Sequence, residues 1–298
     1  MSYLVFDVGG TYIKYACMEE DAAIVTQGKV ITPLDSLEAF VESLLGIRQR
    51  FPAIDDIALS MPGTIDVETG YIFQGGSLRY NAGVNLKEVL EDALQAHVEL
   101  ENDARCASLA ELWKGNLKGI RNGITLTFGT GVGGSMIIDG KPYKGSHCFS
   151  GEVSMLIMDD LRTAGIQGVW GAISSVPALM KHICEAKGVA EEDGVVVFSW
   201  IEQGDEIACT IFQEYCYRIV TQLFNLQMIL DPTTVCIGGG ISENAIFISA
   251  IQKTMEKFYE ALPIQLPHLE IVPCKFHNDS NLIGALYHYK TRRECAYE

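Results

Sequence analysis

The chain has 298 residues, of which 48% are hydrophobic, and carries a formal net charge of −16 at neutral pH. This length and apolar content predict two modest domains, each with a buried core. The acidic balance without clustered Lys or Arg argues against a nucleic-acid partner, and no apolar run is long enough to span a membrane. Scattered cysteines without a C-x-x-C pair, and the lack of a signal pattern, predict free thiols in a reducing cytoplasm.

The first predicted element is a strand, a glycine turn and a second strand within residues 3–17. Glycines without a Cβ let backbone N–H groups approach an anion, and a threonine hydroxyl adds a donor, so the turn suits a nucleotide phosphate. A carboxylate that ends the first strand can hold Mg²⁺ directly or through water. A plain hairpin is the alternative. The residues expected on the nucleotide side are Asp7, which is also the metal candidate, Gly9, Gly10, Thr11 and Lys14.

Helical spacing of apolar residues next predicts a helix over 36–50, followed by a buried strand over 55–60 that stops at Pro62-Gly63. Asn85, with Glu88 three residues later, has the pattern of a capping box and predicts the start of another helix.

Asp103 is the catalytic candidate. It follows a predicted strand over 97–101 and precedes a predicted helix over 104–113. A carboxylate at a helix N-terminus is kept ionised and can accept a proton from an attacking hydroxyl, which is the role of a base in phosphoryl transfer. The neighbouring Asn102 could hydrogen-bond the same sugar. A helix N-cap without a catalytic role is the alternative for Asp103.

A second glycine turn within residues 124–139 repeats the layout of the first, which suggests two copies of one phosphate-binding device. Gly129-x-Gly131-x-x-Gly134 matches the dinucleotide fingerprint, but that motif opens a helix. An alternating strand follows here, which argues against NAD. No Walker motif is present. The residues expected to bind phosphate are Thr130, Gly131, Gly133 and Gly134.

The rest of the chain combines loops, helices and a third glycine cluster. Residues 139–175, rich in Gly and of mixed polarity, predict loops that border a site. The longest helix is expected over 205–230, and a final helix over 281–290 is expected to pack on the first domain. A buried strand over 234–237 leads into Gly238, Gly239 and Gly240, where room for the adenosine and close helix packing are equally open interpretations.

Together these motifs closely resemble the ROK family of bacterial sugar kinases and repressors, in order and spacing, across nearly the whole chain. The resemblance implies an α/β fold of two ribonuclease-H-like, actin/hexokinase-type domains around a central cleft. It also implies ATP with Mg²⁺, phosphoryl transfer to a sugar hydroxyl, and a homodimer. The expected domains are 1–113 with 281–298, and 114–280. The motifs are Asp7-x-Gly9-Gly10-Thr11, Pro62-Gly63, Glu101-Asn102-Asp103-Ala104, Thr130-Gly131-x-Gly133-Gly134, Gly151-Glu152 and Gly238-Gly239-Gly240.

The resemblance assigns roles by position. Asp103 matches the family's base, and the residues that match sugar ligands or the sugar-side loop are Asn102, Glu152, Pro62 and Gly63. Many members carry a histidine and a zinc-binding cysteine cluster after the Gly-Glu pair. Here Val153-Ser154-Met155 follows Glu152 and no such cluster exists, so no zinc site is expected.

That departure disfavours glucokinase and N-acetylmannosamine kinase, which are kept as alternatives. Residues 75–79 and 281–288 resemble the β-glucoside kinases, which act on the 6-hydroxyl of cellobiose-type sugars. For His147 a solvated loop position is favoured over a sugar contact, and for Trp170 buried packing is at least as good an interpretation as stacking on a sugar.

Two other kinds of protein are considered. A ROK repressor or sugar sensor would carry a helix-turn-helix of several dozen residues before the first glycine turn, whereas the strand leading to that turn starts at Tyr3. An actin-like ATPase would hydrolyse ATP without stimulation by any sugar.

Overall fold

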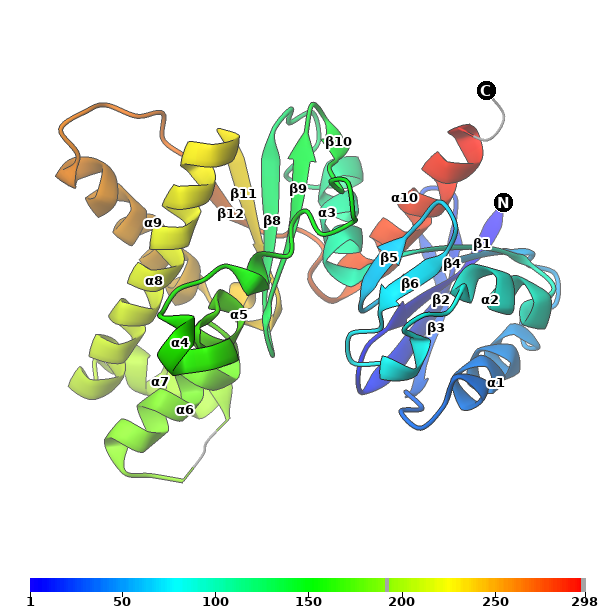
Figure 1. Cartoon of the computed structure of the whole chain (residues 1–298), viewed down its shortest axis with the longest axis horizontal. Coiled ribbons are helices and arrows are strands. Elements are labelled where there is room, and N and C mark those ends of the chain that lie inside the picture. Colours follow the sequence, from blue (N-terminus) through cyan, green and yellow to red (C-terminus); the bar gives the residue numbers. More distant parts are fainter. Residues whose placement is uncertain (191–192, 296–298) are drawn as a thin grey trace. The chain divides into compact units, whose positions relative to one another are not determined.

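The computed structural model describes residues 1–190 and 193–295, and the chain divides into two compact units (Figure 1). The first unit contains residues 1–115, residues 144–149 and the described chain from Asn278 onward. The second contains residues 116–143 and 150–277. The sequence-based division placed residues 144–149 in the second domain, whereas their contacts group them with the first. None of the helices in the described ranges has the length and hydropathy needed to cross a membrane.

A five-stranded sheet in the order β3-β2-β1-β4-β7 forms the centre of the first unit. The β1–β2 and β2–β3 pairs are antiparallel, and the β1–β4 and β4–β7 pairs are parallel. The strands predicted within residues 3–17 and over 55–60 and 97–101 are confirmed within a residue or two, and the structure adds β3, which was not predicted. The bounds are β1 (Ser2–Val8), β2 (Tyr12–Glu19), β3 (Ile24–Ile31), β4 (Asp56–Met61) and β7 (His97–Asn102).

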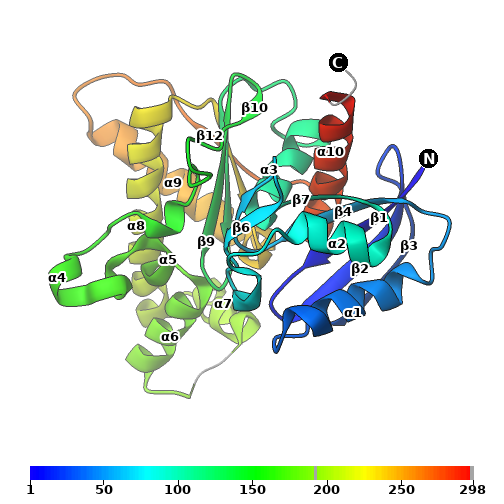
Figure 2. The ribbon, with the colours of Figure 1, turned by 45° about the vertical axis from the view of Figure 1, so that its right-hand side comes forward.

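Helices cover both faces of this sheet (Figure 2). Leu4, Phe6 and Val8 alternate along β1 and join the core formed with the first two helices, while Tyr3 and Asp7 face the last helix. The remaining elements of the unit are α1 (Leu37–Arg48), β5 (Thr64–Asp66), β6 (Tyr71–Gln74), η1 (Arg79–Asn81), α2 (Leu86–Leu94), α3 (Asp103–Lys114) and α10 (Ser280–Cys295).

Local sequence signals explain where these helices begin. The Ser36 hydroxyl accepts a hydrogen bond from the Ala39 N–H at the start of α1. The Asn85 side chain accepts from the Glu88 N–H, which confirms the expected cap of α2. α10 packs on α3 and on β1, β4 and β7, as expected for the final helix.

The second unit repeats the strand arrangement of the first. Its sheet has the order β10-β9-β8-β11-β12, again with two antiparallel pairs followed by two parallel pairs. This shared topology confirms the duplication that the two glycine turns indicated. The strands are β8 (Gly123–Phe128), β9 (Val132–Ile138), β10 (Lys141–Pro142), β11 (Thr234–Gly238) and β12 (Glu270–Pro273).

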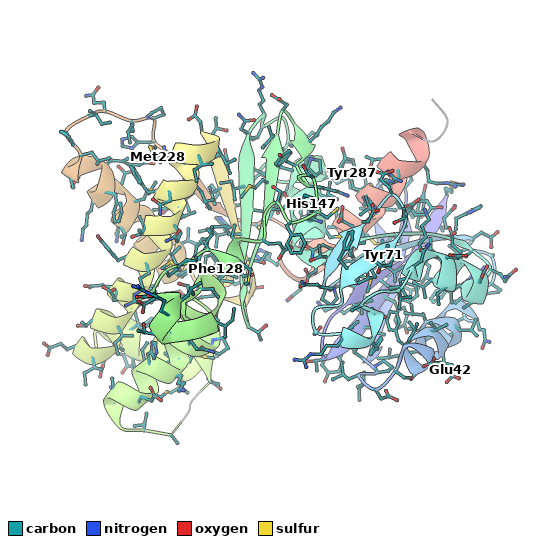
Figure 3. All side chains as sticks on the ribbon, viewed as in Figure 1. Glu42, Tyr71, Phe128, His147, Met228 and Tyr287 are labelled. Atoms are coloured by element: carbon teal, nitrogen blue, oxygen red, sulfur yellow. The ribbon has the colours of Figure 1, made fainter. Side chains whose placement is uncertain are left out.

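Long helices pack on this second sheet through a core that includes Ile124, Leu126 and Phe128 of β8 (Figure 3). α8 (Glu206–Leu230) is the long helix expected over 205–230, and the Asp205 side chain caps it. Residues 139–175 contain only short pieces, as expected: β10, η2 (Val153–Met155), α4 (Leu161–Ala164), η3 (Gly165–Gly168) and α5 (Trp170–Ile173). The other helices are α6 (Val176–Lys187), α7 (Gly194–Glu202), η4 (Gly240–Glu243) and α9 (Ala245–Ala261).

Candidate active site

The first glycine turn joins β1 to β2. The Gly9 N–H donates to the Tyr12 carbonyl oxygen at 2.9 Å. Thr32 braces the turn from β3's end, because its hydroxyl donates to the Gly9 carbonyl oxygen at 2.7 Å. Gly10 and Thr11 at the tip are exposed. The turn is therefore held by its own backbone and by Thr32, with the tip accessible to an anion.

Asp7 lies just before this turn and is only 8% exposed. Its Oδ1 accepts a hydrogen bond from Asn281 Nδ2 at 3.0 Å, and its Oδ2 lies 3.5 Å from Lys14 Nζ. Lys14 also donates to the carbonyl oxygen of Asn278 at 3.3 Å. The structure thus brings Asp7 and Lys14 together and adds Asn281. No local pattern could reveal the contact of Asn281 with Asp7, because the two residues are 274 positions apart in the sequence.

Asn102, and not Asp103, caps α3. The Asn102 side chain accepts a hydrogen bond from the Arg105 N–H, and its φ of −62° and ψ of 143° are those of an N-cap. Asp103 is the first helical residue and half-buried, and its Oδ1 accepts from the Ala104 N–H at 2.8 Å. The alternative that Asp103 is only the N-cap of α3 therefore does not describe its position.

The Pro62-Gly63 loop is fastened to the same place. Asn102 Nδ2 donates to the Gly63 carbonyl oxygen at 3.0 Å. Gly63 has a φ of +117°, and a Cβ there would lie 2.2 Å from the Gln74 carbonyl oxygen, so only glycine fits. Three predicted sugar-side residues, Asn102, Pro62 and Gly63, thus come together in the first unit next to Asp103. Both ends of the Asn102 side chain already have protein partners, which gives this residue a positioning role for the loop and the helix.

Beneath Asp103 is a charged cluster that the sequence did not reveal. Glu101 is fully buried, with Lys144 Nζ 2.7 Å and Arg105 Nη1 3.7 Å from its carboxylate oxygens. His288 Nδ1 lies 3.8 Å away. Burial alone would raise the pKa of Glu101, but attraction to the neighbouring cations outweighs it and lowers the pKa.

Burial lowers the pKa of His288 to about 4, against a smaller opposing effect of Glu101. His288 is therefore neutral at pH 7, and the charges that hold Glu101 ionised are those of Lys144 and Arg105.

The second glycine turn joins β8 to β9 in the second unit. The Gly129 N–H donates to the Gly131 carbonyl oxygen at 3.0 Å, and the Gly129 carbonyl oxygen accepts from the Val176 N–H at the start of α6. Gly129 and Thr130 are exposed, and a Cβ on Gly129 or Gly131 would meet no heavy atom within 4 Å. This turn, like the first, leaves room for a ligand at its tip.

Several of the predicted ligand-binding glycines lie in closely packed places. Gly133 and Gly134 lie within β9, and a Cβ on Gly134 would lie 2.7 Å from the Gly151 carbonyl oxygen. Gly238 is buried at the end of β11, and a Cβ on Gly239 would lie 2.1 Å from the Phe128 carbonyl oxygen. At Gly134 and Gly239 neighbouring backbone occupies the space that a side chain would need, so packing requires glycine there, and ligand contact through the backbone N–H groups of these glycines stays a prediction.

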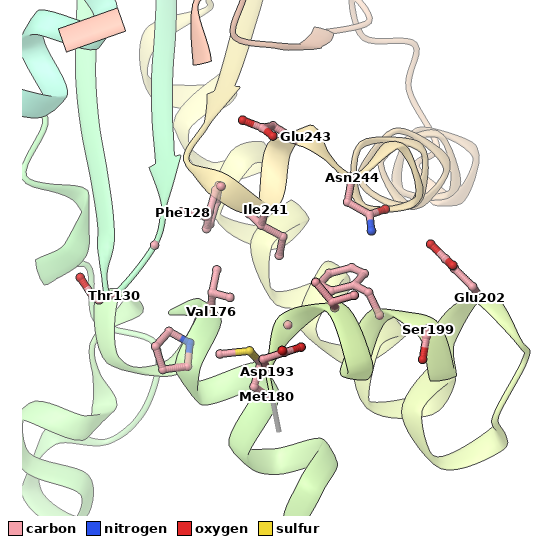
Figure 4. A pocket seen from close by; sticks show the side chains of 16 residues that line it. Phe128, Thr130, Val176, Met180, Asp193, Ser199, Glu202, Ile241, Glu243 and Asn244 are labelled. Carbon is pink, nitrogen blue, oxygen red and sulfur yellow. The ribbon is translucent and has the colours of Figure 1, made fainter. Parts of the chain in front are cut away.

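Gly240, by contrast, opens into a cavity of about 820 Å³ in the second unit (Figure 4). Gly129 and Thr130 of the second turn also line it. Figure 4 shows apolar side chains, Phe128, Val176, Met180 and Ile241, together with polar ones in the same wall, Asp193, Ser199, Glu202, Glu243 and Asn244, of which Asp193 lies beside Met180. The volume and mixed lining suit a ligand of nucleoside size.

Three further predicted residues have these positions. Glu152 follows Gly151 and directly precedes the short η2 of the second unit. Trp170 is fully buried against Phe128, which confirms the packing interpretation. His147 is exposed within the segment 144–149 of the first unit (Figure 3). In the described ranges no group of three or more His, Cys, Asp or Glu side chains is arranged to hold a metal.

The duplicated sheets and paired glycine turns define an α/β protein of the actin/hexokinase-like class. The chain belongs to the ROK family, because the sequence model of this family matches residues 3–292. It is 30% identical to a β-glucoside kinase of Listeria monocytogenes, with 97% of both chains covered. It is 28% identical to a β-glucoside kinase of Klebsiella pneumoniae, with 97% of this chain and 96% of that one covered.

A solved structure shows the same fold. A ROK family protein from Streptococcus pneumoniae in complex with sucrose aligns with a TM-score of 0.88 and 30% identity. The alignment covers 99% of this chain and 100% of that one.

Proposed function

We propose that this chain is an ATP-dependent sugar kinase in which Asp103 is the general base. The observation that carries the proposal is the position of Asp103. Asn102 does the capping of α3, so the Asp103 carboxylate lies in the first helical turn beside the Pro62-Gly63 loop without being the cap. The helix N-terminus favours its ionised form, which can accept a proton from a sugar hydroxyl.

The nucleotide is assigned to the second unit. The cavity beside Gly240 is large enough for the adenosine, and the exposed Gly129-Thr130 turn at its wall would receive the phosphates. The turn at Gly10 and Thr11 is the corresponding phosphate candidate of the first unit. In this division the first domain carries the acceptor sugar and the second carries ATP.

Asp7 is the candidate for Mg²⁺. A single carboxylate fits an ion that usually keeps several waters and is completed by phosphate oxygens. Mg²⁺ when bound would neutralise charge on the transferring phosphoryl group. Asn281 and Lys14 would orient and balance the Asp7 carboxylate.

The reaction is a direct transfer. Asp103 takes the proton of the sugar hydroxyl while that oxygen forms a bond to the γ-phosphorus and the bond to the ADP oxygen breaks. The products are the sugar phosphate, ADP and a proton. Positioning of the two substrates supplies most of the acceleration, since phosphoryl transfer needs little other chemistry from the protein.

For the acceptor we propose the 6-hydroxyl of glucose or of a β-glucoside. The support is the similarity to the two β-glucoside kinases over nearly the full chain. The alternatives are an N-acetylmannosamine kinase and a glucokinase that does not act on β-glucosides. A homodimer and a cytoplasmic location are further expectations, which sedimentation velocity and cell fractionation would test.

The test is a coupled ADP-release assay with Mg-ATP and glucose, N-acetylmannosamine, fructose, cellobiose and gentiobiose. We expect Asp103→Asn to lower kcat by about 10²- to 10⁴-fold, because a positioned base contributes that much, and to leave sugar binding intact. Asp92→Asn, at an exposed position of α2, is the matched control. Near-normal kcat in Asp103→Asn would refute the assignment, and ATP hydrolysis that no sugar stimulates would refute the activity.

A further inference from the structure

The segment Lys144–Phe149 belongs to the first unit, although the chain on either side of it belongs to the second. Two contacts fasten it there. At its start, Lys144 Nζ lies 2.7 Å from the Glu101 carboxylate. Near its end, the Cys148 carbonyl oxygen accepts a hydrogen bond from Arg105 Nη2 at 2.5 Å.

Both anchoring residues flank Asp103. Glu101 precedes it by two residues on β7, and Arg105 follows it by two on α3. Glu101 is 0% and Arg105 2% exposed, so the anchors are buried. A buried charge that loses its partner is strongly unfavourable, so the segment is held firmly next to the candidate base.

Between the two anchors, Gly145, Ser146 and His147 are exposed. The backbone is therefore fixed at both ends while a hydroxyl and an imidazole remain accessible. Both groups can donate and accept hydrogen bonds, as recognition of a sugar's hydroxyls requires. Neither group is needed to hold the segment, because the ion pair and the carbonyl contact do that.

We infer that this segment is part of the acceptor-sugar site, with His147 as a contact that determines sugar affinity and Lys144 as the residue that positions it. The inference rests on the proposed function, because the sugar is the molecule whose hydroxyl Asp103 deprotonates. Lys144 itself is paired with Glu101, so its influence on the sugar passes through the backbone of the segment.

The experiment uses the full chain and the sugar of the panel with the highest kcat/KM. His147→Ala, Lys144→Met and the double variant are compared with His97→Ala and Lys141→Met, which remove the same side chains from exposed positions. Sugar Kd is measured by calorimetry without ATP, and KM for sugar and for ATP in the coupled assay.

We expect His147→Ala to raise sugar Kd and KM about fivefold to tenfold, the effect of one lost hydrogen bond, with KM for ATP unchanged. Lys144→Met should raise the same two constants. The double variant should bind sugar no more weakly than the weaker-binding single variant, because both substitutions disrupt the same contact between His147 and the sugar. Lys144→Arg, which keeps the charge, should restore most of the affinity.

Unchanged sugar Kd in His147→Ala overturns the inference, and since this side chain is exposed, misfolding would not obscure the result. The positioning role of Lys144 is overturned if Lys144→Met raises KM for sugar and KM for ATP equally. It is also overturned if the two substitutions have multiplying effects on sugar Kd in the double variant. Failure of the proposed function has a different signature, since the unaltered protein would then transfer no phosphate to any sugar. A protein that binds sugar without turnover still tests the inference through Kd, and one that binds no sugar overturns it.

Discussion

Two helical glycines of the first unit should respond in opposite ways to the same added methyl group. At Gly284 of α10, a Cβ would lie 1.7 Å from the Cys106 carbonyl oxygen of α3, so the two helices would have to separate. At Gly46 of α1, no heavy atom lies within 4 Å of the Cβ position. Alanine in place of a helical glycine stabilises by about 0.5–1 kcal/mol. Gly46→Ala should therefore raise the free energy of unfolding by that amount, whereas overpacking should make Gly284→Ala a net loss of about 1–3 kcal/mol.

Urea denaturation followed by circular dichroism would measure both free energies of unfolding under the same conditions. Activity adds a second readout. Asn281, three residues before Gly284 on α10, donates a hydrogen bond to Asp7, so a shift of α10 in Gly284→Ala should also lower kcat. Gly46→Ala should keep full kcat. If Gly284→Ala is as stable as the unaltered protein, α3 and α10 do not pack at backbone contact and the reasoning is refuted.

Three other outcomes are expected. His288 is neutral in the fold with a pKa of about 4, so unfolding takes up a proton as the pH falls below 6.5. Between pH 7 and pH 5 this should remove about 2 kcal/mol of stability, and His288→Gln should flatten that slope in denaturant titrations. Asn281→Ala removes a hydrogen bond to the Asp7 carboxylate and should lower kcat about tenfold at unchanged sugar Kd, whereas unchanged kcat would argue against a role for Asp7. Gly240→Phe should fill the cavity and abolish ATP binding in calorimetry while Gly240→Ala does not, and equal ATP affinity in both would place the nucleotide elsewhere.

The fold was readable from the sequence because its signals are local. Two strand–glycine–strand patterns predicted the duplicated sheet. The apolar spacing over 36–50 and the cap at Asn85 marked helix starts that the structure confirms. The place of Asp103 between β7 and α3 was predicted for the same reason. Asn102 and Asp103 are both residue types that cap helices. Which of them is the N-cap depends on the backbone angles, and the structure shows that it is Asn102.

The parts that sequence could not supply depend on residues distant along the chain. Lys144 pairs with Glu101, which lies 43 positions earlier in the sequence, and no local pattern around either residue predicts this contact. The sequence does not distinguish a glycine that leaves space for a ligand from a glycine that packs against a neighbouring backbone segment. Gly240 opens to a cavity while Gly239 packs on Phe128, and only the opposing chain distinguishes them.

The position of α10 has a consequence for synthesis on the ribosome. α10 is made after residues 116–277 and covers the β1, β4 and β7 strands, which are made before those residues. At roughly 5–20 residues per second, the chain between α3 and α10 takes on the order of ten seconds or more to appear. During that time the sheet of the earliest unit has one apolar face uncovered, while residues 116–277 can already complete the later one. The unit that is translated first is therefore the one that finishes folding second.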